Sequence, residues 1–186
     1  MRTEWEAGVR DVSRVAAVKR SGLVGMGPEA ALDSLLELAV VLTGAPRACI
    51  SLVDAERTTA LSSVGFPQDS PLSAPNPFSL CRFVVSARQP LVVSDTRRDP
   101  RTAGDAAIDA FDAAAWAGYA IEDPDGAVLG TLCVMDVVPH VWTARDLLVL
   151  STLARAVSTE IALRQTRDQL RAAQWEIGAL RAAGTG

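Results

Sequence analysis

The sequence predicts an α+β domain with a central antiparallel β-sheet, helices on both faces of the sheet, and long helices at both ends of the chain. The clearest strands are the apolar segments 113–122 and 127–136, which flank the turn sequence Pro124-Asp125-Gly126 and should pair antiparallel. Neither segment alternates between apolar and polar residues, and a strand that is apolar on both faces is covered on both faces. Helices are therefore expected on either side of the sheet.

The first half of the chain predicts two helices and a hairpin. Residues 4–19 and 31–42 each repeat apolar side chains at helical spacing, and Gly44 should end the second helix. The segment 48–54 is short, apolar and rich in strand formers, and 57–65 follows it after a polar pair. This arrangement is typical of a β-hairpin.

The second half predicts a helix over 78–88 and a strand over 90–95, followed by an Asp- and Ala-rich segment, 97–113, that is irregular or helical. Beyond the second hairpin, a helical pattern starts at Thr143 and runs nearly to the end of the chain. Thr143 is the expected N-cap, and Asp146 holds the acidic position of a capping box.

Composition and charge exclude several classes of protein. A chain of 186 residues, 49% hydrophobic and 22% charged, can bury one sizeable core. Its formal charge of −4 offers no general attraction to nucleic acid or anionic lipid. The N-terminus lacks the apolar core of a signal peptide, and the chain lacks an apolar run of about 18 residues, so a cytoplasmic protein with reduced thiols is expected. Cys49, Cys81 and Cys133 lie far apart and His140 is the only histidine, so no metal site is predicted.

Three segments together resemble the GAF domain of bacterial signalling proteins. They are "GLVGMGPEAALDSLLELAVVLTGAPRACISLVDAER", "FSLCRFVVSARQPLVVSDTRRDPR" and "WAGYAIEDPDGAVLGTLCVMD", in the family's order and at similar spacing. The resemblance covers residues 22–163 and leaves an N-terminal helix (1–21) and a C-terminal coiled-coil signalling helix with its tail (164–186). It implies a GAF/PAS-like fold with a pocket on one side of the sheet. Because GAF domains bind different ligands or none, the cofactor stays unknown.

The sequence departs from several subtypes of the family. GAF domains that bind cyclic nucleotides carry an Asn-Lys pattern followed by Phe and Asp-Glu, which is missing here. Relatives that bind bilins place a Cys beside a His, whereas Cys81 is followed by Arg82. The methionine sulfoxide reductases of the family use a cysteine before the fifth strand, where residues 107–118 contain none. The resemblance therefore favours a module without these activities.

Six residues are candidates for ligand binding: Phe78, Cys81, Asp95, Arg101, Trp116 and Cys133. The pocket is expected between the sheet and the segments 78–88 and 95–112, because the proline-rich loop and the Asp-rich segment are too long for mere connections. Trp116 and Tyr119 should face opposite sides of one strand.

Several of these candidates also have a purely structural interpretation. Asp95 and Arg101 suit local turn bonding as well as a polar ligand. Cys133 has no neighbouring base in sequence and is predicted to be a core or pocket-lining residue. For Cys81 both interpretations stay open: it can be a packing residue, or it can be a reactive thiol, because it opens a predicted helix and a helix N-terminus can lower the pKa of a thiol.

The C-terminal helix changes its apolar stripe near Ile161. Beyond that point Leu163, Leu170 and Ile177 stand seven apart, and Leu180 follows three residues later, which is the spacing of a coiled coil. The pattern predicts a parallel homodimer, to which the N-terminal helix would add Trp5, Val9 and Val12.

These observations predict a non-catalytic sensory or dimerisation module that binds a small molecule or relays a signal through its terminal helices to an effector. No set of acid, base and nucleophile is apparent in the sequence. Two alternatives stay open. One is a small thiol-dependent redox enzyme of the GAF fold, which would need a paired or activated cysteine, and the other is a GAF scaffold without a ligand.

Overall fold

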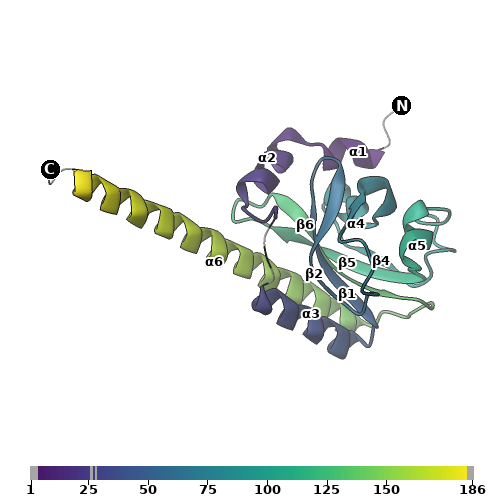
Figure 1. Ribbon diagram of the computed structural model, residues 1–186. Coiled ribbons are helices and arrows are strands. Elements are labelled where there is room, and N and C mark those ends of the chain that lie inside the picture. Colours follow the sequence, from purple (N-terminus) through teal and green to yellow (C-terminus); the bar gives the residue numbers. More distant parts are fainter. Residues whose placement is uncertain (1–3, 26, 28, 184–186) are drawn as a thin grey trace.

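A six-stranded antiparallel sheet forms the centre of the computed structural model, which describes residues 4–25, 27 and 29–183, with the last side chains at 177 and 179 (Figure 1). The strands lie in the spatial order β3-β2-β1-β6-β5-β4. They are β1 (Arg47–Val53), β2 (Arg57–Val64), β3 (Ser73–Pro75), β4 (Leu91–Val93), β5 (Ala115–Glu122) and β6 (Val128–Asp136). The predicted α+β class and both predicted hairpins are confirmed. The structure adds β3, which falls in the proline-rich loop.

The two edge strands, β3 and β4, are the shortest, with three residues each. Pro75 ends β3, and Pro90 directly precedes β4. The four longer strands lie between these two, inside the sheet.

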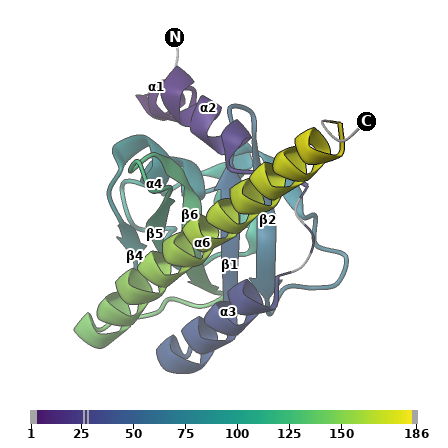
Figure 2. The same cartoon turned by 90° about the vertical axis from the view of Figure 1, so that its left-hand side faces the viewer.

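Helices cover both faces of the sheet, as predicted. On one face, α3 and α6 run side by side across the strands (Figure 2). On the other face, α4 packs over the central strands with α5 and α1 beside it, while α2 lies at one end of the sheet (Figure 1). The helices are α1 (Glu4–Val9), α2 (Val12–Arg20), α3 (Ala30–Thr43), α4 (Cys81–Ala87), α5 (Ala106–Phe111) and α6 (Ala144–Ala183).

The sheet separates two apolar clusters. Trp116 on β5 belongs to the cluster beneath α4, whereas Tyr119 on the same strand packs against the cluster beneath α3 and α6. The prediction that these two side chains face opposite sides is thus confirmed. All nine residues of β6 are buried, because both of its faces are covered.

The single helix predicted over residues 4–19 is wrong, because the chain breaks between α1 and α2. The carboxylate of Asp11 accepts the backbone N–H of Arg14 at 2.9 Å and so caps α2 with a non-helical backbone. The buried guanidinium of Arg14 donates to the carbonyls of Val53, at 2.6 Å, and Val128, at 3.3 Å. These bonds tie α2 to the ends of β1 and β6.

The predicted capping box opens α6. The backbone N–H of Thr143 donates to the carboxylate of Asp146 at 2.8 Å, and the N–H of Asp146 donates to the Thr143 hydroxyl at 3.2 Å. The helix then packs on the sheet as far as Ile161 and continues away from the domain (Figure 1). None of the helices in the described residues is both long enough and apolar enough to cross a membrane.

Candidate functional site

A cavity of about 260 Å³, partly open to solvent, lies on the α4 side of the sheet. Strands β1, β2, β5 and β6 form its base, and the start of α4, the helix α5 and the loop between β2 and β3 surround it. Its lining side chains are apolar groups, hydroxyls and thiols, with one amide, and no charged residue occurs among the described lining residues. The largest lining side chains are Phe66, Leu72, Leu80, Phe111, Trp116 and Met135.

Five polar or sulfur-containing side chains meet at the base of the cavity and form what we call the thiol–hydroxyl cluster. On the paired strands β1 and β6, Cys49 stands opposite Cys133 and Ser51 stands opposite Thr131. The hydroxyls of Ser51 and Thr131 lie 3.0 Å apart. Cys81, the first residue of α4, places its sulfur 3.2 Å from the Ser51 hydroxyl.

The three thiols of the cluster differ in acidity. Hydrogen bonding to Cys133 is the largest cause that lowers the pKa of Cys81, to about 6, and it acts with bonds to Ser51, Ser79 and Thr131 against the opposing effect of burial. The interaction with Cys81 and then burial raise the pKa of Cys133 well above its ordinary value. Burial likewise raises the pKa of Cys49. One acidic thiol therefore stands beside two thiols that keep their protons.

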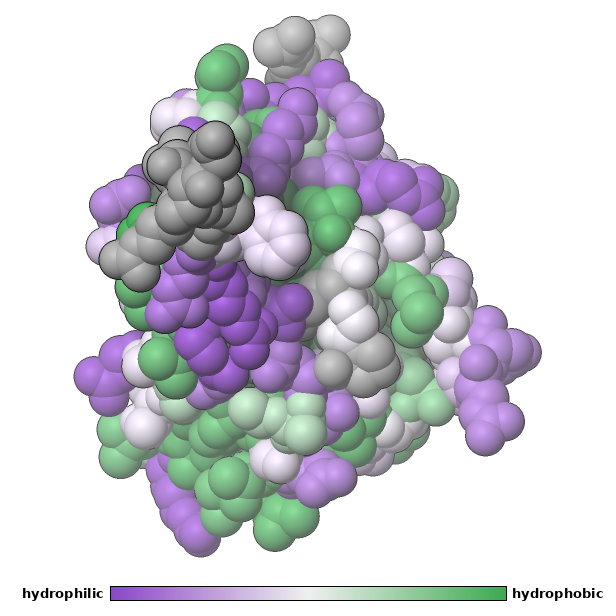
Figure 3. Space-filling view, turned by 60° about the vertical axis from the view of Figure 1, so that its left-hand side comes forward, coloured by the Kyte–Doolittle hydropathy of each residue, from purple (hydrophilic) through white to green (hydrophobic). Residues whose placement is uncertain are grey.

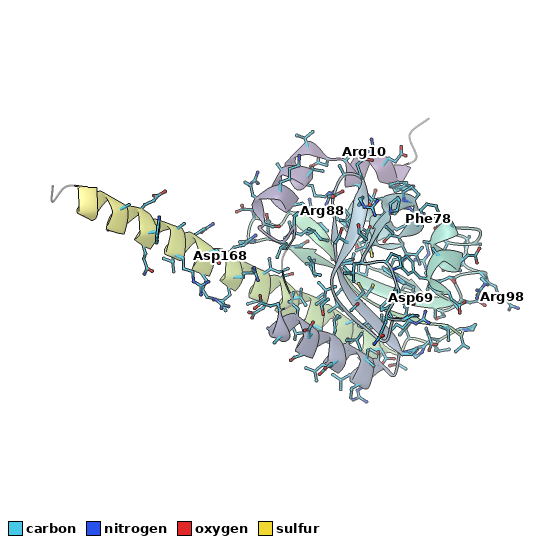
Figure 4. The ribbon with its side chains drawn as sticks, in the orientation of Figure 1. Arg10, Asp69, Phe78, Arg88, Arg98 and Asp168 are labelled. Carbon is cyan, nitrogen blue, oxygen red and sulfur yellow. The ribbon has the colours of Figure 1, made fainter. Side chains whose placement is uncertain are left out.

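Three of the six predicted ligand-binding residues line the cavity: Cys81, Trp116 and Cys133. Whether they contact a ligand stays a prediction. The other three do not line it. Phe78 ends the short helical turn Asn76–Phe78, where its side chain lies at the molecular surface with 44% of its area exposed (Figure 4).

Asp95 and Arg101 belong to a surface turn instead of the cavity. The guanidinium of Arg101 donates to the Asp99 carboxylate and to the Val92 carbonyl, both at 2.7 Å. The carboxylate of Asp95 accepts the backbone N–H of Arg97 at 3.1 Å. Local bonding thus holds both side chains away from the cavity, as their structural interpretation allowed.

The position of the pocket needs a further correction. The segment 78–88 contributes only its first residues, and 95–112 contributes only Ala107 and Phe111. The loop 65–72 and the first residues of β3 supply much of the lining. The length of the proline-rich loop indicated that a pocket exists, but the loop itself was not expected to line it.

The predicted dimer residues of the C-terminal helix are half-exposed. Leu163, Leu170 and Ile177 expose 51%, 57% and 50% of their surface, so their apolar side chains have no full cover within the chain. The side chain of Leu180 lies outside the described residues.

The predicted dimer residues of the N-terminal helix lie elsewhere in the fold. Val9 is fully buried in the apolar cluster beneath α4, and Trp5 packs on the Arg82 guanidinium, 5.1 Å from the ring centre. Only Val12 is freely exposed. Val9 is therefore unavailable to a bundle with the C-terminal helix, because its own domain buries it, whereas a dimer contact of the half-buried Trp5 stays a prediction.

In the described part of the chain, no group of three or more His, Cys, Asp or Glu residues has the geometry to hold a metal ion. The thiol–hydroxyl cluster therefore offers nucleophiles and hydrogen-bonding groups. Chemically, it can stabilise a thiolate at Cys81 and contact the polar end of an uncharged molecule.

The GAF domain model matches residues 27–161, and the chain belongs to the GAF domain family. A cyclic di-GMP phosphodiesterase of Pseudomonas aeruginosa is 29% identical over 157 residues, which cover 83% of this chain and 26% of that protein. The chain thus spans about a quarter of the length of this relative.

Solved structures show the same fold. The PixJ GAF domain of Thermosynechococcus elongatus, in its blue-light-absorbing form, superposes with a TM-score of 0.65 at 17% identity, over 88% of this chain and 95% of that one. A type II free methionine-R-sulfoxide reductase of Thermoplasma acidophilum gives a TM-score of 0.58 at 10% identity, over 71% and 90%. The GAF fold therefore serves both a photoreceptor domain and an enzyme, and the site decides between such roles.

Proposed function

We propose that this chain is a sensory GAF module that binds an uncharged, largely apolar small molecule and relays its presence through α6. The cavity carries this proposal. Its volume of about 260 Å³ suits a small ligand, and its lining combines apolar side chains with a few hydroxyls and thiols. A charged ligand would lose its hydration there without gaining an ion pair from the described lining residues. A neutral ligand avoids that cost.

The strands β5 and β6 connect the cavity with α6. Cys133 and Met135 of β6 line the cavity, while Leu132 and Val134 between and beside them pack in the cluster beneath α3 and α6. The backbone N–H of Glu122, at the end of β5, donates to the Ser158 hydroxyl of α6 at 3.0 Å. A ligand that shifts these strands would therefore shift the helix packed on their other face.

The segment of α6 beyond residue 163 is proposed as the output. It extends away from the domain with an exposed apolar stripe, and it would pair with a second copy and lead to an effector. The phosphodiesterase relative supports this role, since the matched region is only part of a longer protein.

A neutral fluorescent probe, N-phenyl-1-naphthylamine, tests the binding site. We expect its fluorescence to rise on binding the wild-type chain. Ala60→Phe, which fills the cavity, should weaken binding by about tenfold or more. Ala172→Phe makes the same change on the exposed surface of α6 and should leave binding unaltered.

Two results would argue against this function. Equal affinity of the Ala60→Phe variant and the wild type would place the probe outside the cavity. Tighter binding of an anionic analogue, 1-anilinonaphthalene-8-sulfonate, would contradict the preference for uncharged ligands.

A thiol-dependent reaction is the second candidate function, and the acidic thiol of Cys81 inside the cavity is the observation that favours it.

A further inference from the structure

Three thiols from distant parts of the sequence meet in one cavity. Cys49 and Cys133 stand opposite each other on β1 and β6, and the sulfur of Cys81 approaches from the start of α4. All three cysteines are free. A cysteine that only packs in a core needs neither hydroxyl partners nor an opening to solvent, whereas a reactive thiol needs access and groups that stabilise its charge.

We propose that Cys81 is a modification site at which a small uncharged hydroperoxide is reduced in the cavity, leaving a disulfide between Cys81 and Cys133. The proposal uses the same cavity as the proposed sensory function and deepens it, because it names a chemical class that the module would sense.

The surroundings of Cys81 support its role as the attacking thiol. Its sulfur lies 3.2 Å from the Ser51 hydroxyl, and that hydroxyl lies 3.0 Å from the hydroxyl of Thr131. Such a chain of hydroxyls can direct a hydrogen bond onto a thiolate. With a pKa near 6, Cys81 is mostly deprotonated at neutral pH, and the thiolate is the nucleophilic form.

The cavity determines which oxidant can reach this thiol. Cys81 itself is buried, but it lines a cavity that is partly open to solvent. The described lining contains no charge and much apolar surface, so an uncharged hydroperoxide can enter without losing an ionic hydration shell. Apolar side chains such as Phe66 and Trp116 would accommodate the organic group of an alkyl hydroperoxide.

The reaction has two steps and balances with one hydroperoxide. The Cys81 thiolate attacks the terminal oxygen, a sulfur–oxygen bond forms, the oxygen–oxygen bond breaks, and the alkoxide takes a proton from water to leave as an alcohol. The thiol of Cys133 then loses its proton and attacks the Cys81 sulfenic acid, so that a disulfide forms and water leaves. In total, two thiols and ROOH give a disulfide, ROH and water, and the peroxide is reduced by two electrons.

Cys133 is the better-placed second thiol. Its pKa is raised first by its interaction with Cys81 and then by burial. Once Cys81 is oxidised to the sulfenic acid, its sulfur no longer carries a negative charge. The pKa of Cys133 therefore falls, and its thiol can lose the proton before it attacks. Cys49 has a pKa raised chiefly by burial, which this oxidation leaves in place.

The test treats the reduced full chain with cumene hydroperoxide and measures intact mass and peptide connectivity. We expect a mass loss of two hydrogen atoms and a Cys81–Cys133 linkage. Cys49→Ser is the matched control and should react like the wild type. Cys133→Ser should stop at the sulfenic acid, which dimedone traps on Cys81, and Cys81→Ser should lose the reaction.

Competitive alkylation of the native wild type covers the case in which a variant does not fold. Iodoacetamide at neutral pH should label Cys81 about tenfold faster or more than Cys49. The proposal is overturned if Cys81 reacts no faster, if the disulfide joins Cys49 instead, or if Cys81→Ser still loses two hydrogen atoms. Failure of the neutral fluorescent probe to bind would count against the proposed ligand-binding function alone, because neither the mass nor the labelling measurement depends on that probe.

Discussion

The Cys81 thiol lies where α4, β1 and β6 meet, and its neighbours give it an unusual acidity. Cys49 and Cys133 are the titratable groups beside it on the sheet, and Arg82, which interacts with its charge, follows it on α4. Because the pKa of Cys81 falls from 9.0 to about 6 on folding, the native state loses this proton while the unfolded state still holds it.

The free energy of unfolding should therefore rise with pH between about 6 and 9, and the contribution is lost as the pH falls through 6. Cys49 and Cys133 keep their protons in the native state across this range, since their native pKa values are raised, and in the unfolded state they ionise only near its upper end. Denaturant unfolding at pH 5.5 and pH 8.5 should show that the free energy of unfolding rises by about 3 kcal/mol more in the wild type than in Cys81→Ser.

The control for this prediction is Cys49→Ser, which removes a neighbouring thiol but should keep the wild-type dependence on pH. An equal dependence in Cys81→Ser and the wild type would mean that Cys81 stays protonated in the folded chain.

The cysteines also show where sequence reasoning stops at the residue scale. Trp116 and Tyr119 were correctly expected on opposite faces of the sheet, because strand alternation is a local property. The thiol–hydroxyl cluster depends on the pairing of β1 with β6, two strands far apart in the sequence, and on where α4 begins. The spacing of the cysteines along the sequence shows neither the strand pairing nor the start of the helix, so no partner could be predicted for any of the three thiols.

At the scale of single elements, the outer half of α6 carries an apolar stripe that the described part of the chain leaves partly exposed to solvent. Leu163, Leu170 and Ile177 repeat every seventh residue and are half-exposed. Pairing with a second copy would bury this stripe as a coiled-coil seam.

Replacing Leu170 and Ile177 together with Glu should convert a dimer to a monomer, because like charges would face each other across the seam. Light scattering at micromolar concentration measures the mass. Ala172→Glu with Gln174→Glu adds the same charge to neighbouring positions of the helix outside the predicted stripe and should leave the dimer intact. A wild-type monomer, or a Leu170→Glu/Ile177→Glu dimer, would contradict the seam.

Elements with a strong local signal were predicted well. The hairpin β5–β6 and the start of α6 are examples, since Gly126 takes positive φ in the turn and Thr143 forms its capping box. The break between α1 and α2 was missed because the apolar spacing continues through it. Asp11 ends one helix and caps the next, and this effect outweighs the periodic pattern.

For the molecule as a whole, α6 divides into a part that belongs to the domain and a part that does not. The helix has 40 residues, a length of about 60 Å, but its buried apolar contacts end at Ile161. Among the described residues, its last bonds to the rest of the chain are those of Arg164, which pairs with Glu29, and Gln165, which donates to the Ser21 carbonyl.

Truncation after Asp168 should consequently leave the folded domain almost as stable, with a change in Tm of less than about 3 °C in the monomer. Truncation after Val157 removes Ile161 and Arg164 and should lower Tm by about 10 °C. Thermal unfolding followed by circular dichroism at low concentration measures both. A large loss of stability on the shorter deletion would mean that the outer helix packs on its own domain.

The helical face carries a second apolar surface. Val41 on α3 and Leu148 on α6 are largely exposed, and Figure 3 shows apolar side chains gathered in the lower part of the molecule, where α3 lies. This surface adjoins the inner half of α6, so a second copy that pairs through the outer half could also cover it.

The three-residue strands β3 and β4 have a consequence for how the protein behaves at high concentration. An exposed sheet edge is a template on which another chain can add a strand, and long, flat edges therefore promote aggregation. Here each edge strand has only three residues, and prolines, which cannot donate a backbone hydrogen bond, stand at the end of β3 and just before β4. The two edge strands thus give another chain little backbone to pair with, which favours contact between copies of this chain through their helices over contact through these strands.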